Sequence, residues 1–289
     1  MKEFSLSAAL LAASLLTSTA QDRPLWMRHC AISPDGKTIA FSYKGDIFTV
    51  SSQGGKAQQI TSNPAYDSYP VWSKDGKHIA FASDRKGSLD VWAVSREGGS
   101  PRRLTTHSGK ELPVAFLNDT TVLYTAAVMP TAQSSFFANS DFHQVYQVGI
   151  HGGRPHLFSG LNMESISING KGDLLYQDKK GYEDPYRKHQ QSPIARDIWL
   201  RQGDKYSRLT NFAGEDRNPV WGADGKSFYY LSEKSGSFNV YKRSAVGGDE
   251  RQLTSFKKNP VRFLSVADNG TLCFGYDGEL YTLREGETP

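Results

Sequence analysis

The sequence carries few polar residues in the spacings that catalysis requires. A serine nucleophile on a strand-to-helix elbow needs a Gly-x-Ser-x-Gly motif or an equivalent, and none of the serines lies in one. The seven histidines are dispersed, without a His-Glu-x-x-His motif or another paired ligand spacing, so the sequence predicts no zinc site. The Gly-Gly pairs lie between predicted strands and precede no helix that could hold a phosphate. We therefore expect no catalytic residue, no metal and no cofactor.

Acidic, basic and aromatic side chains occur together in segments that the sequence predicts as long loops. Such a mixture can hold an extended peptide by its termini and side chains. The candidate ligand-binding residues are Tyr66, Asp67, Tyr69, Arg85, Tyr182, Glu183, Asp184, Arg187, Lys188, His189, Glu215, Asp216 and Arg217.

A structural interpretation competes for part of this set. Asp84-Arg85 belongs to a repeated pattern and is expected to form local ion pairs across blades, as are residues 215–217. The segment 182–189 has no equivalent in the other copies of the repeat, so the scaffold does not require it.

One repeated unit must position these loops, and residues 71–105 are its best-formed copy. They contain a strand, a tight turn at Asp75-Gly76, two further strands, a turn at Gly98-Gly99 and a short closing strand. Asp-Gly and Gly-Gly are the dipeptides that hairpin turns with positive φ prefer. The unit is therefore a four-stranded antiparallel meander, with two apolar faces that it cannot bury alone.

The meander recurs six times, with Asp35 and Asp75 one period of 40 residues apart. This period predicts an all-β fold, a six-bladed β-propeller of four-stranded antiparallel blades, in which radial packing buries both faces of every blade. An open sandwich fits less well because its strands carry no turn signature at a fixed period. The expected blades are residues 29–61, 70–105, 113–158, 164–210, 219–254 and 260–289.

The last copy ends before any counterpart of the closing Leu-Thr strand. Either residues 23–28 supply the outer strand of that blade or the natural chain continues beyond Pro289, because an unpaired outer edge invites aggregation.

Residues 1–20 differ from the rest and read as a secretory signal peptide. Lys2 precedes an apolar stretch from Leu6 to Leu16, and small residues surround a cleavage point after Ala20. The apolar run is too short to cross a bilayer, so we expect export to the periplasm or the exterior of a bacterium, without membrane insertion after cleavage. The formal charge of +4 is scattered, without a basic run, which argues against nucleic-acid binding.

Two cysteines, Cys30 and Cys273, each lie in a predicted strand. A small buried apolar role is the simpler interpretation of both. A disulfide between them is the alternative, and sequence alone cannot place them within bonding distance.

The geometry of a meander separates the loops onto two faces. The loops between second and third strands emerge beside the connectors between blades, and the other face carries only short Asp-Gly and Gly-Gly turns. All the long loops fall on the first face, where the rigid scaffold would present them for binding.

The repeat resembles that of TolB-like and tricorn-like propellers, which share W-S-x-D-G-K-x-I-A-F-x-S-D-R-x-G-x-x-D-[IV]-W followed by G-G and L-T. Five further segments, GYEDPYRKHQ, RDIW, GEDRNP, YYLSEKSGSFNVYK and LSVADNGTLCFGYDGELYTL, are similar to the amino-terminal propeller of secreted bacterial tricorn-like serine peptidases. The resemblance spans residues 24–289. It implies a peptidase whose second propeller, PDZ domain and catalytic domain lie downstream, outside this chain.

Three functions follow as hypotheses. The first is a non-catalytic propeller that gates or binds peptide or protein substrates for downstream peptidase domains of the same polypeptide. The second is a stand-alone periplasmic interaction module of the TolB type. The third is a lone lyase or glycosidase that uses channel carboxylates, although spacing alone assigns no carboxylate pair to a channel.

Overall fold

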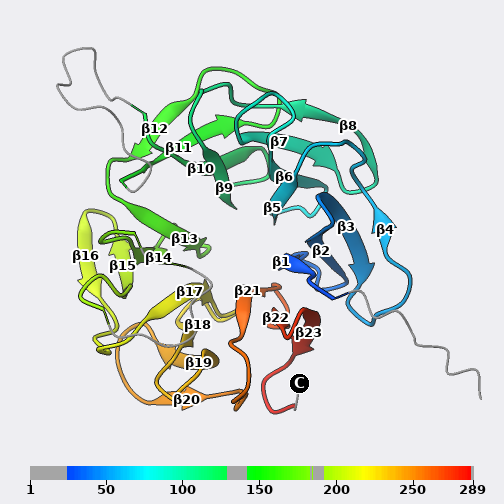
Figure 1. Cartoon of the computed structure of the whole chain (residues 1–289). Coiled ribbons are helices and arrows are strands. Elements are labelled where there is room, and N and C mark those ends of the chain that lie inside the picture. Colours follow the sequence, from blue (N-terminus) through cyan, green and yellow to red (C-terminus); the bar gives the residue numbers. More distant parts are fainter. Residues whose placement is uncertain (1–24, 129–141, 183, 185–191, 288–289) are drawn as a thin grey trace, which may run out of the picture.

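The chain folds into six antiparallel sheets arranged radially around a central space (Figure 1). The computed structural model describes residues 25–128, 142–182, 184 and 192–287, and in these residues it contains strands and turns but no helix. The predicted six-bladed propeller is confirmed, with five four-stranded sheets and a sixth in which three strands are described.

Each sheet is a meander whose strands follow sequence order from the centre outward. The first three blades comprise β1 (Arg28–Ile32), β2 (Thr38–Tyr43), β3 (Asp46–Ser51) and β4 (Gln58–Gln59); β5 (Asp67–Trp72), β6 (His78–Ser83), β7 (Asp90–Ser95) and β8 (Gly98–Arg103); and β9 (Glu111–Phe116), β10 (Thr121–Ala126), β11 (Gln144–Gly149) and β12 (His156–Ser159). The last three comprise β13 (Met163–Ile168), β14 (Leu174–Asp178), β15 (Ile198–Gln202) and β16 (Lys205–Arg208); β17 (Asp216–Trp221), β18 (Ser227–Ser232), β19 (Asn239–Ser244) and β20 (Glu250–Gln252); and β21 (Arg262–Val266), β22 (Leu272–Tyr276) and β23 (Glu279–Leu283).

The Asp-Gly turns owe their shape to a small hydrogen-bond network. In the second blade, Ser73 Oγ donates to Asp75 Oδ1 at 2.7 Å, and the same oxygen accepts from the backbone N–H of Lys77 at 3.1 Å. Gly76 follows with a φ of 69°, a conformation that favours glycine. The Ser73 hydrogen bond lowers the pKa of the Asp75 carboxyl, so the turn holds a charged acceptor at neutral pH.

The closing Leu-Thr strand has a polar function that repeats around the ring. In four blades, the hydroxyl of a threonine two residues after the outer strand accepts a hydrogen bond of 2.9 Å. The donor is the backbone N–H of the first or second residue of the third strand. The pairs are Ile47 with Thr61, Val91 with Thr105, Ile198 with Thr210, and Val240 with Thr254. All four threonines are buried, so no water is available to replace the hydroxyl.

The hydrophobic core lies between neighbouring blades. Ala40, Ile47 and Ile60 of the first blade, for example, pack against Ile79 and Phe81 of the second. Three tryptophans are buried in this core, at positions 72, 92 and 221, whereas Trp199 is half-buried. Two indoles also join blades: Trp72 donates to Ala31 O at 2.9 Å and Trp221 donates to Asp173 O at 3.1 Å.

The ring closes where the first and last blades meet, with β1 packed against β21 and β22. Hydrogen bonds cross this seam from Ile32 N to Ser265 Oγ at 3.1 Å and from Asp268 N to Pro34 O at 2.9 Å. Of residues 23–28, those described form no outer strand on β23: Arg28 begins β1, and Met27 N donates to Gly278 O at 3.1 Å, in the β22–β23 turn. Residues 23 and 24 lie outside the described residues.

Replacing Thr105 by valine should remove the acceptor of the buried Val91 N–H and lower the free energy of unfolding by about 1–3 kcal/mol. Thr105→Ser keeps the hydroxyl and loses one methyl group, so it should cost only about 1 kcal/mol. Urea unfolding of the two variants measures the difference. A loss in Thr105→Val no larger than that in Thr105→Ser would contradict the hydrogen bond as the main stabilising contribution of this side chain.

Candidate functional site: the central channel

The inner strands of five blades carry the same backbone irregularity. In β1, β5, β13, β17 and β21 the register with the next strand shifts, so that two residues oppose one. The first residue of each bulge has a positive φ although it is not glycine: His29 (50°), Tyr69 (54°), Ser165 (49°), Asn218 (51°) and Phe263 (60°). Such backbone conformations cost about 1–3 kcal/mol each and tend to persist at functional sites. All five residues line the central cavity.

The third blade is the exception, and its sequence explains why. Tyr69 lies three residues before Trp72, and the residue three before Phe116, the counterpart of Trp72, is Pro113. The proline ring fixes φ near −65°, so this position cannot adopt the positive φ of its equivalents. The register shift of β9 lies one residue later, around Val114.

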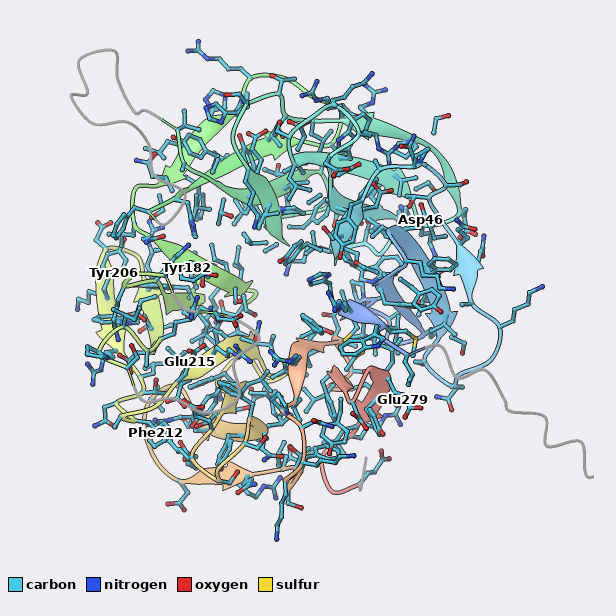
Figure 2. All side chains as sticks on the ribbon, viewed as in Figure 1. Asp46, Tyr182, Tyr206, Phe212, Glu215 and Glu279 are labelled. Carbon is cyan, nitrogen blue, oxygen red and sulfur yellow. The ribbon has the colours of Figure 1, made fainter. Side chains whose placement is uncertain are left out.

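The cavity occupies the centre of the ring and has a volume of about 980 Å³ (Figure 2). Its wall comes from the inner strands of all six blades, with connector residues 107–110 at its mouth. Among the described residues, each inner strand is hydrogen-bonded to a strand on one side only, so its other edge borders the cavity. Some backbone groups of these strands are already bonded to side chains, as Ile32 N is to Ser265 Oγ and Asn218 N is to Gln177 Oε1. The free edge of a strand presents backbone N–H and C=O groups that can pair with another extended chain.

One side of the channel is aromatic and spans the closure of the ring. The rings of His29 and Tyr69 lie 4.0 Å apart between centroids, and His29 meets Phe263 edge-on at 4.9 Å. Burial lowers the pKa of His29 to about 3, assisted by the nearby positive charges of Arg28 and Lys110. The imidazole is therefore neutral at physiological pH, so the ring cluster of His29, Tyr69 and Phe263 is itself uncharged. Two cations of the wall, Lys110 and Arg262, lie on this same side of the cavity.

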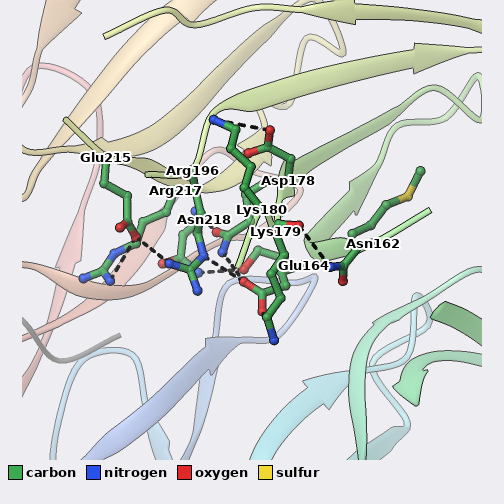
Figure 3. A network of polar contacts seen from close by, with 12 residues as sticks. Asn162, Glu164, Asp178, Lys179, Lys180, Arg196, Glu215, Arg217 and Asn218 are labelled. Carbon is green, nitrogen blue, oxygen red and sulfur yellow. Dashed lines mark hydrogen bonds and ion pairs between the residues drawn. The ribbon is translucent and has the colours of Figure 1, made fainter. Parts of the chain in front are cut away.

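The opposite side, from blades four and five, is a chain of ion pairs (Figure 3). Arg196 donates from Nε to Glu164 Oε2 at 2.9 Å and lies 3.4 Å from Glu215 Oε1 through Nη1. Arg217 Nη1 lies 3.5 Å from the same Glu215 oxygen, so this carboxylate bridges two guanidinium groups. Lys179 adds a further contact to Glu164 at 3.6 Å.

This ion-pair chain is buried and electrostatically tuned. Burial acts to raise the pKa of Glu164, but the charge and hydrogen bond of Arg196 outweigh it and hold the pKa below its usual value. The guanidinium of Arg217 also lies over the Phe238 ring at 3.9 Å, which holds it in place. Both arginines are stabilised in the charged form and fixed in direction.

The bulges join this network to the wall. Asn218 donates from Nδ2 to Ser165 Oγ at 3.1 Å, linking the bulge residues of blades five and four. Its backbone N–H donates to Gln177 Oε1 at 2.8 Å, and Gln177 Nε2 donates to Glu164 Oε2 at 2.9 Å. The unusual backbone of Asn218 is therefore supported by side-chain hydrogen bonds from the neighbouring blade.

The charges on the wall are unequal in number. Among the described lining residues, five side chains are cationic and two are acidic: Lys110, Lys179, Arg196, Arg217 and Arg262 against Glu164 and Glu215. The three excess positive charges line a concave space, where they focus a field that attracts negatively charged groups.

The structure brings part of the predicted site to this cavity. Tyr69, Tyr182, Glu215 and Arg217 line it. Tyr66 lies elsewhere, in a shallow hollow with Leu25 and Trp26. Asp184 is exposed, and Glu183, Arg187, Lys188 and His189 lie outside the described residues.

Asp67, Arg85 and Asp216 are placed inside blades. Arg85 Nη2 lies 2.6 Å from Asp67 Oδ2, and its guanidinium stacks over the Trp92 ring at 4.7 Å. Arg85 thus forms an ion pair, as expected, but the pair lies within the second blade and not across blades. Asp216 is fully buried at the start of β17.

The sequence analysis did not single out the residues that line most of the wall, among them His29, Glu164, Ser165, Arg196, Asn218, Arg262 and Phe263. Aligning the six repeats on the position of Trp72 would have identified the five bulge residues. Each lies three residues before that position and faces the centre of the ring.

The described residues contain neither a cluster of metal ligands nor a helix that could span a membrane. In the part of the chain that the structure describes, no group of three or more His, Cys, Asp or Glu side chains is placed to hold a metal ion. The described residues also form no helix with the length and apolarity needed to span a membrane.

A six-bladed ring of four-stranded meanders around a central channel defines the chain as a β-propeller. Residues 24–288 match the family described as the tricorn protease N-terminal beta propeller domain, and the chain belongs to that family. These residues therefore correspond to a non-catalytic domain of tricorn protease.

Individual relatives agree with this assignment. The chain is 25% identical over 262 residues to tricorn protease homolog 1 of Streptomyces coelicolor, covering 87% of this chain and 23% of that protein. It superimposes on the crystal structure of the tricorn protease with a TM-score of 0.76 and 20% identity, over 91% of this chain and 25% of the other. The chain thus spans about a quarter of the length of these relatives.

A second group of similar structures shares the fold. The structure of putative TolB from Agrobacterium tumefaciens superimposes with a TM-score of 0.65 and 15% identity, and 90% of each chain is covered. At this identity the similarity shows the propeller fold alone.

The buried carboxyl of Asp216 should make stability depend on pH. Burial raises its pKa from 3.8 to about 6. An acid with a raised folded-state pKa stabilises the fold below its unfolded pKa, and this contribution is lost as the pH rises through about 6. The free energy of unfolding should therefore fall by up to about 3 kcal/mol between about pH 4 and pH 7 through this group.

Asp216→Asn should remove that part of the pH dependence, measured by urea unfolding across this pH range. Burial also raises the pKa of Glu111, to about 7, so the difference between wild type and variant is the relevant quantity. Asp249→Asn, at an exposed position, is the matched control and should keep the wild-type slope. An unchanged slope in Asp216→Asn would contradict the assignment.

Proposed function

We propose that this propeller binds extended peptide segments in its central channel and acts as the non-catalytic, substrate-gating domain of an exported tricorn-like serine peptidase. The observation that carries the proposal is the channel wall itself, in which an aromatic cluster lies opposite a chain of ion pairs and the cations of the whole wall outnumber its acids. The peptidase domains belong to other parts of the natural polypeptide.

Each component of the wall matches a component of a peptide. The cavity-side strand edges can accept and donate main-chain hydrogen bonds to an extended chain, through backbone groups other than those already bonded to side chains, such as Ile32 N and Asn218 N. The surface of His29, Tyr69 and Phe263 offers contact to apolar or aromatic side chains. The excess of cations favours acidic side chains, so the channel should select acidic segments that contain aromatic residues.

Binding of two labelled peptides of equal length tests this selectivity. A peptide rich in aspartate and phenylalanine should bind more tightly than one in which lysine replaces aspartate, as measured by fluorescence anisotropy at low salt. Removing two wall charges with Lys110→Gln and Arg262→Gln should weaken the acidic peptide about tenfold, which corresponds to about 1.4 kcal/mol.

The control for this experiment is Lys56→Gln, an exposed charge on the outer Gly-Gly turn of the first blade, far in the fold from the inner strands. It should leave the affinity unchanged. Equal weakening by the control would mean that net charge attracts the peptide, and equal affinity for both peptides would reject the selectivity.

Export is the second part of the proposal, and it rests on the composition of residues 1–20. Expressed with its own leader in a bacterium, the chain should be recovered from the periplasmic fraction beginning at Gln21, as intact-mass spectrometry would show. Recovery from the cytosol with Met1 to Ala20 still attached would exclude export through this segment.

A stand-alone interaction module of the TolB type is the alternative function. It is favoured by one observation, namely that the putative TolB structure and this chain cover 90% of one another. Affinity purification from an envelope extract separates the two functions, because a stand-alone module requires a stable protein partner and a peptide-gating domain does not.

A further inference from the structure

The two cysteines come from opposite ends of the chain and meet at the seam that closes the ring. Cys30 lies in β1, next to the bulge residue His29, and Cys273 lies in β22 of the last blade. Both are buried free thiols, with exposed fractions of 5% and 0%. They belong to one apolar cluster with Phe41 and Ala267, so the two blades share a core at this point.

Both cysteines adjoin the same strand, β21. Cys30 Sγ donates to Phe263 O in β21 at 3.4 Å. Two residues further along β21, Ser265 pairs with Cys273 in the sheet register, and Ser265 Oγ accepts from Ile32 N across the seam at 3.1 Å. The thiol of Cys30 also contacts that of Cys273, and this contact together with burial raises the pKa of Cys30.

We propose that Cys30 and Cys273 form a disulfide that locks the first blade to the last. The seam is the point of the ring where such a bond has most to add. In the described residues the last sheet has three strands, and side-chain packing with a few hydrogen bonds holds β1 against β21 and β22.

The oxidation balances with an external disulfide as oxidant, either a protein disulfide or oxidised glutathione. Both S–H bonds break and one S–S bond forms, while two electrons and two protons reduce the oxidant's disulfide to two thiols. Attack requires a thiolate, which the dry seam disfavours. The bond therefore forms while the seam is open during folding, and burial then protects it from reductants.

The disulfide would affect both the entropy of the unfolded chain and the rigidity of the channel wall. A disulfide between these positions closes a loop that contains nearly the whole propeller, and the loss of chain entropy grows with loop length. Cys30 also follows the bulge at His29 directly, so fixing its sulfur fixes the aromatic side of the channel. The proposal does not depend on peptide binding.

The test uses the purified chain, unfolded and refolded with a mixture of reduced and oxidised glutathione. Proteolysis without reductant followed by mass spectrometry should show the peptides that contain Cys30 and Cys273 joined to each other. The Tm of the oxidised protein should exceed that of the same sample treated with a phosphine reductant under unfolding conditions by roughly 5–15 °C.

Cys30→Ala and Cys273→Ala serve as controls, because neither should show a Tm difference between oxidised and reduced samples. If these variants do not fold, the comparison of oxidised and reduced wild type carries the test. Three results overturn the proposal: alkylation of both thiols after oxidative refolding, glutathione attached to either cysteine in place of the link, or linked peptides without a rise in Tm.

Discussion

A four-stranded meander has two apolar faces, and the need to bury both faces governs the whole structure. Each blade packs against a neighbour on either side, as when Ala40 and Ile47 of the first blade meet Ile79 and Phe81 of the second. A row of such blades has two exposed ends, so burial is complete only when the row closes into a ring. The contact of β1 with β21 and β22 is therefore a requirement of the fold.

Closing the ring also creates the channel, because the innermost strands cannot converge on a point. Their cavity-side edges are left without a sheet partner, and the bulges turn side chains such as His29, Asn218 and Phe263 toward the space between them. Backbone strain is supported here by contacts between blades, as in the hydrogen bonds of Asn218 to Ser165 and Gln177. Scaffold and candidate site are thus made by the same strands.

The sequence predicted the scaffold better than the channel, for a physical reason. Turn chemistry is local, so Asp75-Gly76 and Gly98-Gly99 identify hairpins without knowledge of the fold. The wall depends on which residues of separate blades face one centre, and only the ring defines that centre. Tyr69 and Arg217 were found because they adjoin long loops, whereas His29 and Phe263 have no loop to mark them. Asp67 and Arg85 look alike in sequence whether they bind a ligand or each other.

The contact between the first and last blades determines both the closure of the ring and the shape of the channel. His29 belongs to the first blade and Phe263 to the last, yet their rings meet at 4.9 Å, so the aromatic side of the channel exists only while the ring is closed. Cys30 and Cys273 lie behind the same contact, in the core shared by the two blades. Any force that opens the seam must separate the cysteines and divide the aromatic surface together. Stability of closure and integrity of the binding surface are consequently one property of this propeller, set between β1, β21 and β22.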